Sequence, residues 1–369
     1  MSQSDLIAHA VLQQFSKLPP KRKPAVRDNG IHEWVPLSGI VAEKDGVLKC
    51  LALATGMKCL PASKVSQSNG IGIHDWHAEV LAMRTFNYFL LDECENILEE
   101  GDESSILQKQ TNTPDNDENP TLQLFKIKNN VKLHMYCSEA PCGDASMELT
   151  MAAQEDAAAW ETPHPINTTP RADSHISLLG RACFSRTGIV RRKPARGDAP
   201  PTLSKSCSDK LALKQCTSLL SAITSIFIDP SHAYIHSLIL PGSQYSEAAC
   251  RRAFSAEGRM NLMVGKKWPG GYSFREFSIA TTDLEFEFSK RAVQARADKI
   301  SASNLAVTWS RSGFEESIIG GVIQGRKAFK KDAASRVSKS CMWEAANDLA
   351  CRIGVVCSPT TICLGDDGK

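Results

Sequence analysis

Apolar and polar residues alternate in blocks along the chain, and their spacing predicts its secondary structure. Residues 4–16 follow the period of an amphipathic helix, short apolar runs broken by glycine at 34–59 predict a hairpin, and residues 77–98 predict a long helix. The same reasoning then predicts a strand at 131–141, a helix after the turn Pro141-Cys142-Gly143, a helix near 211–225, a strand near 234–240 and a helix at 246–254. This alternation predicts a layered α/β domain.

Two segments interrupt the pattern. Residues 101–120 contain the polar run TNTPDNDENP, and residues 155–204 are rich in Pro, Arg, Thr and Ser. Such compositions bury little apolar surface, so both segments are expected to be disordered or surface insertions. The remainder of residues 1–369 is expected to form a single domain.

Composition narrows the class of protein. With 369 residues and 42% hydrophobic content, the chain is large enough for a substantial core. Its formal net charge of +2 means that contact with a polyanion must rely on local basic patches. No apolar stretch approaches the roughly 20 residues of a membrane span, and the N-terminus lacks a signal-peptide core, so a cytoplasmic or nuclear protein is expected.

Three short segments carry the candidate chemistry, each at a predicted helix start. They contain His77 and Glu79, Cys142, and Cys207. One histidine and two cysteines make three zinc ligands, and a three-ligand site keeps the open position of a catalytic zinc. Glu79, which is not a ligand, is suited to shuttle protons, as in zinc nucleobase deaminases.

The third ligand is not fixed by spacing. The usual Cys-x-x-Cys pair is absent, because Ala145 stands three residues after Cys142. On spacing alone, Cys137, Cys183 and Cys207 compete for the place. The chain has thirteen cysteines, scattered and odd in number, so most are expected to be reduced and buried.

The runs TGMKCL, HDWHAEVLAMR, PCGDAS, RRKPARGD and SCSDKLAL resemble the adenosine-deaminases-acting-on-RNA family, and its tRNA-acting branch most closely. The resemblance extends from residue 4 to about residue 343. It implies a three-layer, cytidine-deaminase-like fold with a central mixed sheet flanked by helices. It also implies Cys207 as the third zinc ligand, and conversion of adenosine to inosine immediately 3′ of the anticodon of tRNA-Ala.

Basic residues are expected to track the RNA phosphates. The resemblance places Lys58 in the substrate pocket. The densest cluster lies beside Cys207 and comprises Arg186, Arg191, Arg192, Lys193 and Arg196. A second cluster, Lys21, Arg22, Lys23 and Arg27, is more typical of a solvated surface. Asp144 and Asp209 are expected to hold the starts of helices.

The resemblance further implies inositol hexakisphosphate as a buried structural cofactor. The matching positions here are Arg84, Lys210, Ser218 and Lys339. The chain ends in VVCSPTTICLGDDGK, where the resemblance implies helices that supply further Tyr and Lys side chains. Weak binding of the cofactor is therefore predicted.

Three rival functions are less favoured. An inactive RNA-binding pseudo-deaminase would not need Glu79, and a deaminase of free nucleosides usually takes two nearby cysteines. A double-stranded RNA deaminase is disfavoured because RRKPARGD replaces the base-flipping loop and no tandem RNA-binding domains precede the catalytic region. The expected partner is tRNA, with neither DNA nor a membrane.

Overall fold

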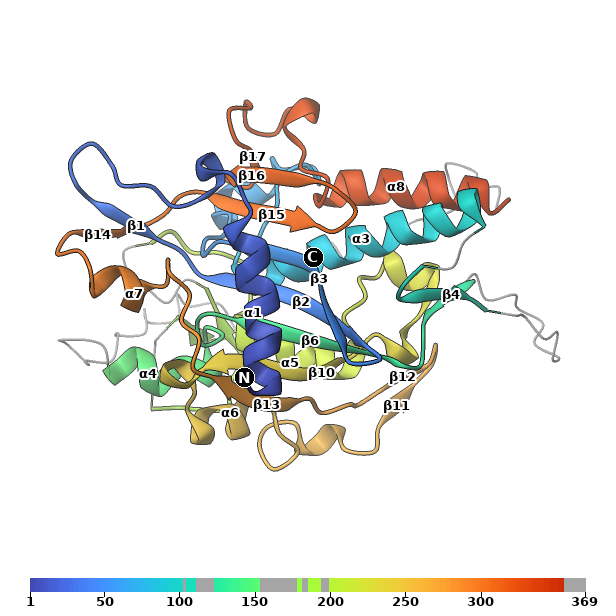
Figure 1. Ribbon diagram of the computed structural model, residues 1–369, viewed down its shortest axis with the longest axis horizontal. Coiled ribbons are helices and arrows are strands. Elements are labelled where there is room, and N and C mark those ends of the chain that lie inside the picture. The colour runs from blue at the N-terminus through green and yellow to red at the C-terminus, as the bar shows by residue number, and fades with distance from the viewer. Residues whose placement is uncertain (102–103, 111–122, 153–177, 181–184, 194–198, 355–369) are drawn as a thin grey trace, which may run out of the picture.

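A mixed eight-stranded sheet forms the centre of the molecule in the computed structural model, which describes residues 1–101, 104–110, 123–152, 178–180, 185–193 and 199–354 (Figure 1). In spatial order the strands are β13 (Ser278–Thr282), β10 (Ile235–Pro241), β6 (Val131–Cys137), β2 (Leu37–Lys44), β3 (Val47–Thr55), β15 (Ala306–Ser310), β16 (Glu315–Ile319) and β17 (Val322–Ile323). The first three run parallel, and every other neighbouring pair is antiparallel.

Helices cover both faces of this sheet. The helices of the described residues are α1 (Gln3–Ser16), α2 (Ala62–Val65), α3 (Ala78–Glu100), α4 (Met147–Ala152), α5 (Cys207–Thr217), α6 (Glu247–Phe254), α7 (Lys290–Gln294) and α8 (Lys339–Arg352). Helix α1 packs on one face, whereas α3, α5 and α8 pack on the other (Figure 1). The three-layer α/β class expected from the sequence is confirmed.

Smaller sheets and 3-10 turns surround this framework. The sheets are β1 (His32–Trp34) with β14 (Ile300–Ala302), β4 (Leu107–Lys109) with β5 (Phe125–Ile127) and β9 (Ile228–Asp229), β7 (Leu178–Leu179) with β8 (Arg191–Arg192), and β11 (Lys267–Trp268) with β12 (Tyr272–Ser273). The 3-10 turns span Pro20–Arg22, Asp144–Ser146, Thr224–Ile226, Pro230–His232, Gly242–Gln244, Asn261–Met263 and Lys331–Ala333.

Apolar side chains fill both layers between helices and sheet. Phe86 and Leu90 of α3 pack with Leu51 of the sheet, while on the other face Val11 and Phe15 of α1 belong to a second cluster. Each fully buried large side chain contributes about 1.5–3 kcal/mol. The end of β3 and the start of α3, where His77 lies, are therefore held on a rigid support. In the described part of the chain, every helix is too short or too polar to cross a membrane.

The structure corrects two sequence expectations. Part of the 101–120 segment is the strand β4, because Leu107 is buried and the strand pairs with β5. The helix expected near 211–225 runs from Cys207 to Thr217, since Ser206 caps its start and Ser218 takes a positive φ of 56° at its end. Residues 111–122, 153–177, 181–184 and 194–198 of the two expected insertions lie outside the described residues.

Candidate active site

His77 precedes the first residue of α3 and is held against the end of β3. Its backbone N–H donates to Asp75 Oδ1 at 3.0 Å, and the next amide, of Ala78, donates to the carbonyl of Gly56 at 2.9 Å. Gly56 has a φ of 141°, and a Cβ there would lie 2.1 Å from the Trp76 carbonyl oxygen. Glycine at this position therefore allows the histidine loop to approach the strand.

Cys142 and Cys207 meet through a second close approach. Cys142 follows β6, and Cys207 begins α5, whose cap Ser206 accepts a hydrogen bond from Asp209. Gly143 has a φ of 105°, and a Cβ there would lie 2.3 Å from Ser206 Oγ. Only a residue without a side chain lets the two loops come this near.

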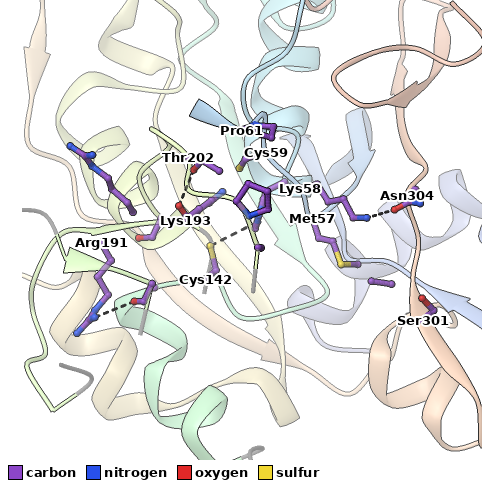
Figure 2. A pocket seen from close by; sticks show the side chains of 18 of the residues that line it. Met57, Lys58, Cys59, Pro61, Cys142, Arg191, Lys193, Thr202, Ser301 and Asn304 are labelled. Carbon is purple, nitrogen blue, oxygen red and sulfur yellow. Dashed lines mark hydrogen bonds between the residues drawn. The ribbon is translucent and has the colours of Figure 1, made fainter. Parts of the chain in front are cut away.

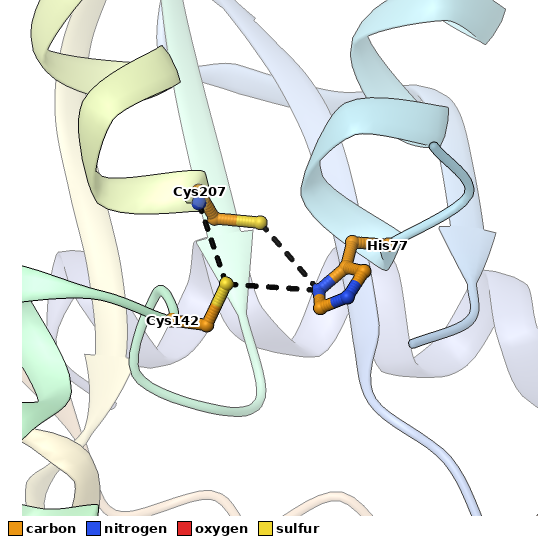
Figure 3. A group of neighbouring side chains, drawn as sticks. All are labelled: His77, Cys142 and Cys207. Atoms are coloured by element: carbon orange, nitrogen blue, oxygen red, sulfur yellow. Dashed lines mark hydrogen bonds between the residues drawn. The ribbon is translucent and has the colours of Figure 1, made fainter. Parts of the chain in front are cut away.

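The three candidate ligands form one cluster (Figure 3). Nδ1 of His77 lies 3.8 Å from Sγ of Cys142 and 3.7 Å from Sγ of Cys207. Tetrahedral zinc, with Zn–S near 2.3 Å and Zn–N near 2.1 Å, would place such atoms about 3.6 Å apart. The donor set and its spacing therefore fit zinc, with a fourth position left for water.

Buried charges surround the sulfurs. Lys193 is 3% exposed, and its Nζ lies 3.1 Å from Sγ of Cys207 and 2.8 Å from a carboxylate oxygen of Asp75. Lys210 donates to the same carboxylate. Burial alone would raise the pKa of Asp75, but the charge of Lys193 is among those that hold it well below its usual range. Asp75 is thus an anion that ties the lysine to the ligand cluster.

Glu79 lies in the first turn of α3 and is 5% exposed. Burial raises the pKa of this carboxyl, and the neighbouring positive charge of His77 opposes that rise. A carboxyl whose pKa moves toward neutrality can both accept and return a proton. Its position two residues after His77 places it beside the ligand cluster.

A cavity of about 690 Å³ opens over this cluster. Its volume lies within the range of about 300–1,000 Å³ that is typical of ligand pockets. His77 and Cys142 form part of the lining, and Figure 2 shows Ser301 and Asn304 across the cavity from Cys142 and Arg191. The candidate metal site is therefore open to a substrate-sized group.

Residues 52–360 match the family model described as the adenosine-deaminase (editase) domain. The chain belongs to this family. It is 37% identical to the tRNA-specific adenosine deaminase 1 of Schizosaccharomyces pombe, over 88% of this chain and 79% of that protein. It is 32% identical to the Saccharomyces cerevisiae protein of the same name, over 92% of this chain and 81% of that protein. The mouse double-stranded RNA-specific editase B2 is 28% identical over 59% of this chain and 28% of that protein.

The structure places the three cysteines that were candidates for the third ligand position differently. Cys207 lies in the cluster with His77 and Cys142. Cys137 is buried in β6 as part of the hydrophobic core. Cys183 lies outside the described residues.

The expected phosphate-binding residues differ in where they lie. Arg191 lines the cavity but is 1% exposed, and its guanidinium donates to the carbonyl oxygens of Gly180 and Arg186. Lys193 also lines the cavity and is buried, and its ammonium donates to Asp75 and to Sγ of Cys207.

Two of the other expected contacts also line the cavity. Lys58 and Arg192 line it, and Nζ of Lys58 donates to Asn304 (Figure 2). Arg186 is exposed. Arg196 lies outside the described residues.

Sequence reasoning missed Asp75 and Asn304. An acid two residues before a ligand histidine was a usable signal for Asp75, because metal-binding histidines are commonly supported by a nearby carboxylate. Asn304 carried none, since only the fold brings the β14–β15 connection to the cavity. Asp144 and Asp209 accept local hydrogen bonds from Gly188 and Ser206, as expected of acids at helix starts.

Proposed function

We propose that this deaminase hydrolyses adenosine to inosine in tRNA, immediately 3′ of the anticodon of tRNA-Ala, with zinc as its cofactor. The observation that carries the proposal is the cluster of His77, Cys142 and Cys207 beside a buried carboxylate at a substrate-sized cavity. The names of the two yeast relatives support tRNA as the substrate.

Bound by the three ligands, zinc would supply hydroxide at neutral pH for attack on C6 of adenine. Glu79 accepts the proton of the attacking water and delivers it to N1 of the ring. Glu79 then takes the proton of the hydroxyl formed at C6 and relays it to the departing amino group, so that the C–N bond breaks and water and adenosine yield inosine and ammonia. The raised pKa of Glu79 suits both directions of transfer.

The chain's own dipoles and charges stabilise the thiolates. The N–H of Cys207 donates to Sγ of Cys142 at 3.4 Å, and the ammonium of Lys193 donates to Sγ of Cys207 at 3.1 Å. Charge-assisted hydrogen bonds of this kind favour the ionised ligand, which is the form that binds metal. Lys193 is therefore a positioning residue of the ligand cluster.

Lys58 and Arg192, which line the cavity, are proposed to contact the RNA. Arg196, which lies outside the described residues, is proposed as a further RNA contact. An adenosine in an anticodon loop is already partly unstacked, so presenting it to the cavity costs less than extracting it from a duplex. Arg191 and Lys193 also line the cavity, but they are buried and their cationic groups bind other groups of the protein, so they are left out of this set.

The test is to incubate the purified protein with an unmodified tRNA-Ala transcript and to sequence the product for inosine. The expected result is one inosine 3′ of the anticodon. Glu79→Gln should abolish it while zinc content, measured by mass spectrometry, stays near one per chain. A duplex RNA substrate, run in parallel, tests the rival function of a double-stranded RNA deaminase. The proposal would be overturned if the duplex were edited while the tRNA contained no inosine, or if Glu79→Gln kept full activity.

Inositol hexakisphosphate is proposed to bind near His74. Burial and then the charges of Arg84, Lys339 and Lys210 lower the pKa of that histidine, so three cations gather at one place. Lys339 is exposed, and buried Ser218 lies at the end of α5. A cationic donor set fits a polyphosphate. Phosphate analysis of denatured protein tests the proposal: less phosphate than one molecule per chain would support weak binding, and none at all would exclude the cofactor.

A further inference from the structure

A segment that precedes the family match reaches the active-site cavity. The match covers residues 52–360, yet Arg27 lines the cavity together with Ser301 and Asn304. Strand β1 explains how this happens, because it pairs in parallel with β14 and thereby joins the N-terminal segment to that wall (Figure 1). This wall lies across the cavity from Cys142 (Figure 2).

Arg27 stands on a well-defined turn. Its backbone N–H donates to the Ile31 carbonyl at 2.9 Å, and Gly30 donates back to the Arg27 carbonyl at 2.8 Å. Gly30 takes the positive φ of 76° that this tight connection requires. The bridge between Val26 and His32 closes the turn onto β1. The backbone of Arg27 is therefore fixed relative to the cavity wall.

Its guanidinium is oriented by one carboxylate. Nε and Nη2 lie 2.8 Å and 2.7 Å from Oε1 of Glu33, whose other oxygen accepts from Ser303 Oγ at 2.7 Å. The Arg27 side chain is 38% exposed. A guanidinium has five N–H donors, so one edge can face Glu33 while the other binds an anion. The ion pair also reduces the rotamer freedom that binding would otherwise remove.

The three neighbouring cations of the same cluster are placed differently. Arg22 donates to Glu315 and to Ser317 Oγ, and Lys23 donates to a carbonyl in α1. Lys21 is exposed and borders a different cavity, together with Arg22. Among these four residues, the structure thus directs Arg27 alone to the candidate active site.

We infer that Arg27 binds a backbone phosphate of the RNA strand next to the nucleotide held in the cavity. This inference rests on the proposed function, because an isolated nucleoside would offer no such phosphate. Phosphate is the chemistry favoured here, since a guanidinium edge matches two of its oxygens in a planar, bidentate contact. Arg27 is thus a substrate-binding residue supplied from outside the matched region.

The test compares wild type, Arg27→Ala and Arg27→Lys on the tRNA substrate, with Lys21→Ala as the control from the same cluster. Arg27→Ala should raise KM about tenfold at unchanged kcat, and should reduce the slope of log affinity against log salt by about one. Arg27→Lys keeps the charge and should restore most of the slope. Lys21→Ala should match wild type.

Three results would overturn the inference: a wild-type KM and salt slope for Arg27→Ala, a loss confined to kcat, or an equal loss with Lys21→Ala. Failure of the proposed function looks different, because wild type would then make no inosine. Binding of labelled tRNA to the same four proteins still tests Arg27 in that case. Thermal unfolding of each variant identifies a loss that comes from loosening the turn.

Discussion

Removing the ammonium of Lys193 should weaken both the fold and the metal site. Lys193 and Asp75 are 3% and 5% exposed, and their two N–O distances are 3.1 Å and 2.8 Å. Breaking such a buried pair from one side costs about 3–5 kcal/mol, because the remaining charge is left in the interior. For Lys193→Met we expect the lower end, about 3 kcal/mol, since Lys210 still contacts Asp75.

The same change should lower zinc affinity about 10–100-fold, the usual effect of losing a group that supports a metal ligand. Lys193 donates to Sγ of Cys207 at 3.1 Å, and without it that thiolate loses a charge-assisted partner. Urea unfolding measures the stability, and competition with a chromogenic chelator measures the affinity. Lys132→Met, an exposed lysine on β6, should change unfolding by less than about 0.5 kcal/mol.

A double variant tests whether Lys193 and Asp75 stabilise the fold as a pair. If the loss comes from a stranded carboxylate, Lys193→Met combined with Asp75→Asn should be less destabilising than the sum of the single changes, by about 0.5–3 kcal/mol. Additive losses would refute the account of the pair. Unchanged zinc affinity in Lys193→Met would refute its contact with the thiolate.

Three further outcomes are expected. Gly143→Ala should lower zinc content and the melting temperature, because its Cβ would lie 2.3 Å from Ser206 Oγ; a normal metal content would contradict this. Cys207→Ser should lose zinc while Cys137→Ser keeps it, as measured by metal analysis of the purified proteins. Burial lowers the pKa of His134 below 6.5, so the unfolded chain binds more protons than the folded chain. The free energy of unfolding should therefore decrease as the pH is lowered below about 6.5. His134→Gln should flatten that fall in urea titrations, and an unchanged pH dependence would exclude this source.

Much of the fold could be read from local pattern. Helices α1 and α3 could be predicted from their 3.6-residue apolar period, and strands β2 and β3 from apolar runs broken by glycine. Each of these elements buries one face, which produces the pattern. Strand β4 was not, since only its pairing with β5 reveals it within a polar segment. The start of α5 depends on the cap at Ser206, which moves Cys207 into the first turn.

The sequence by itself determined which residue types could bind zinc and that each stands at a helix start, because those features are local. Tertiary structure alone decided which cysteines meet His77, since the partners are 65 and 130 residues away and join only where Gly56 and Gly143 permit close approach. It also decided that Lys193 is buried while Arg27 reaches the cavity. The sequence of a basic segment does not show which of its side chains are buried and which reach a cavity. The contact with Asp75 buries Lys193, and the pairing of β1 with β14 brings Arg27 to the cavity.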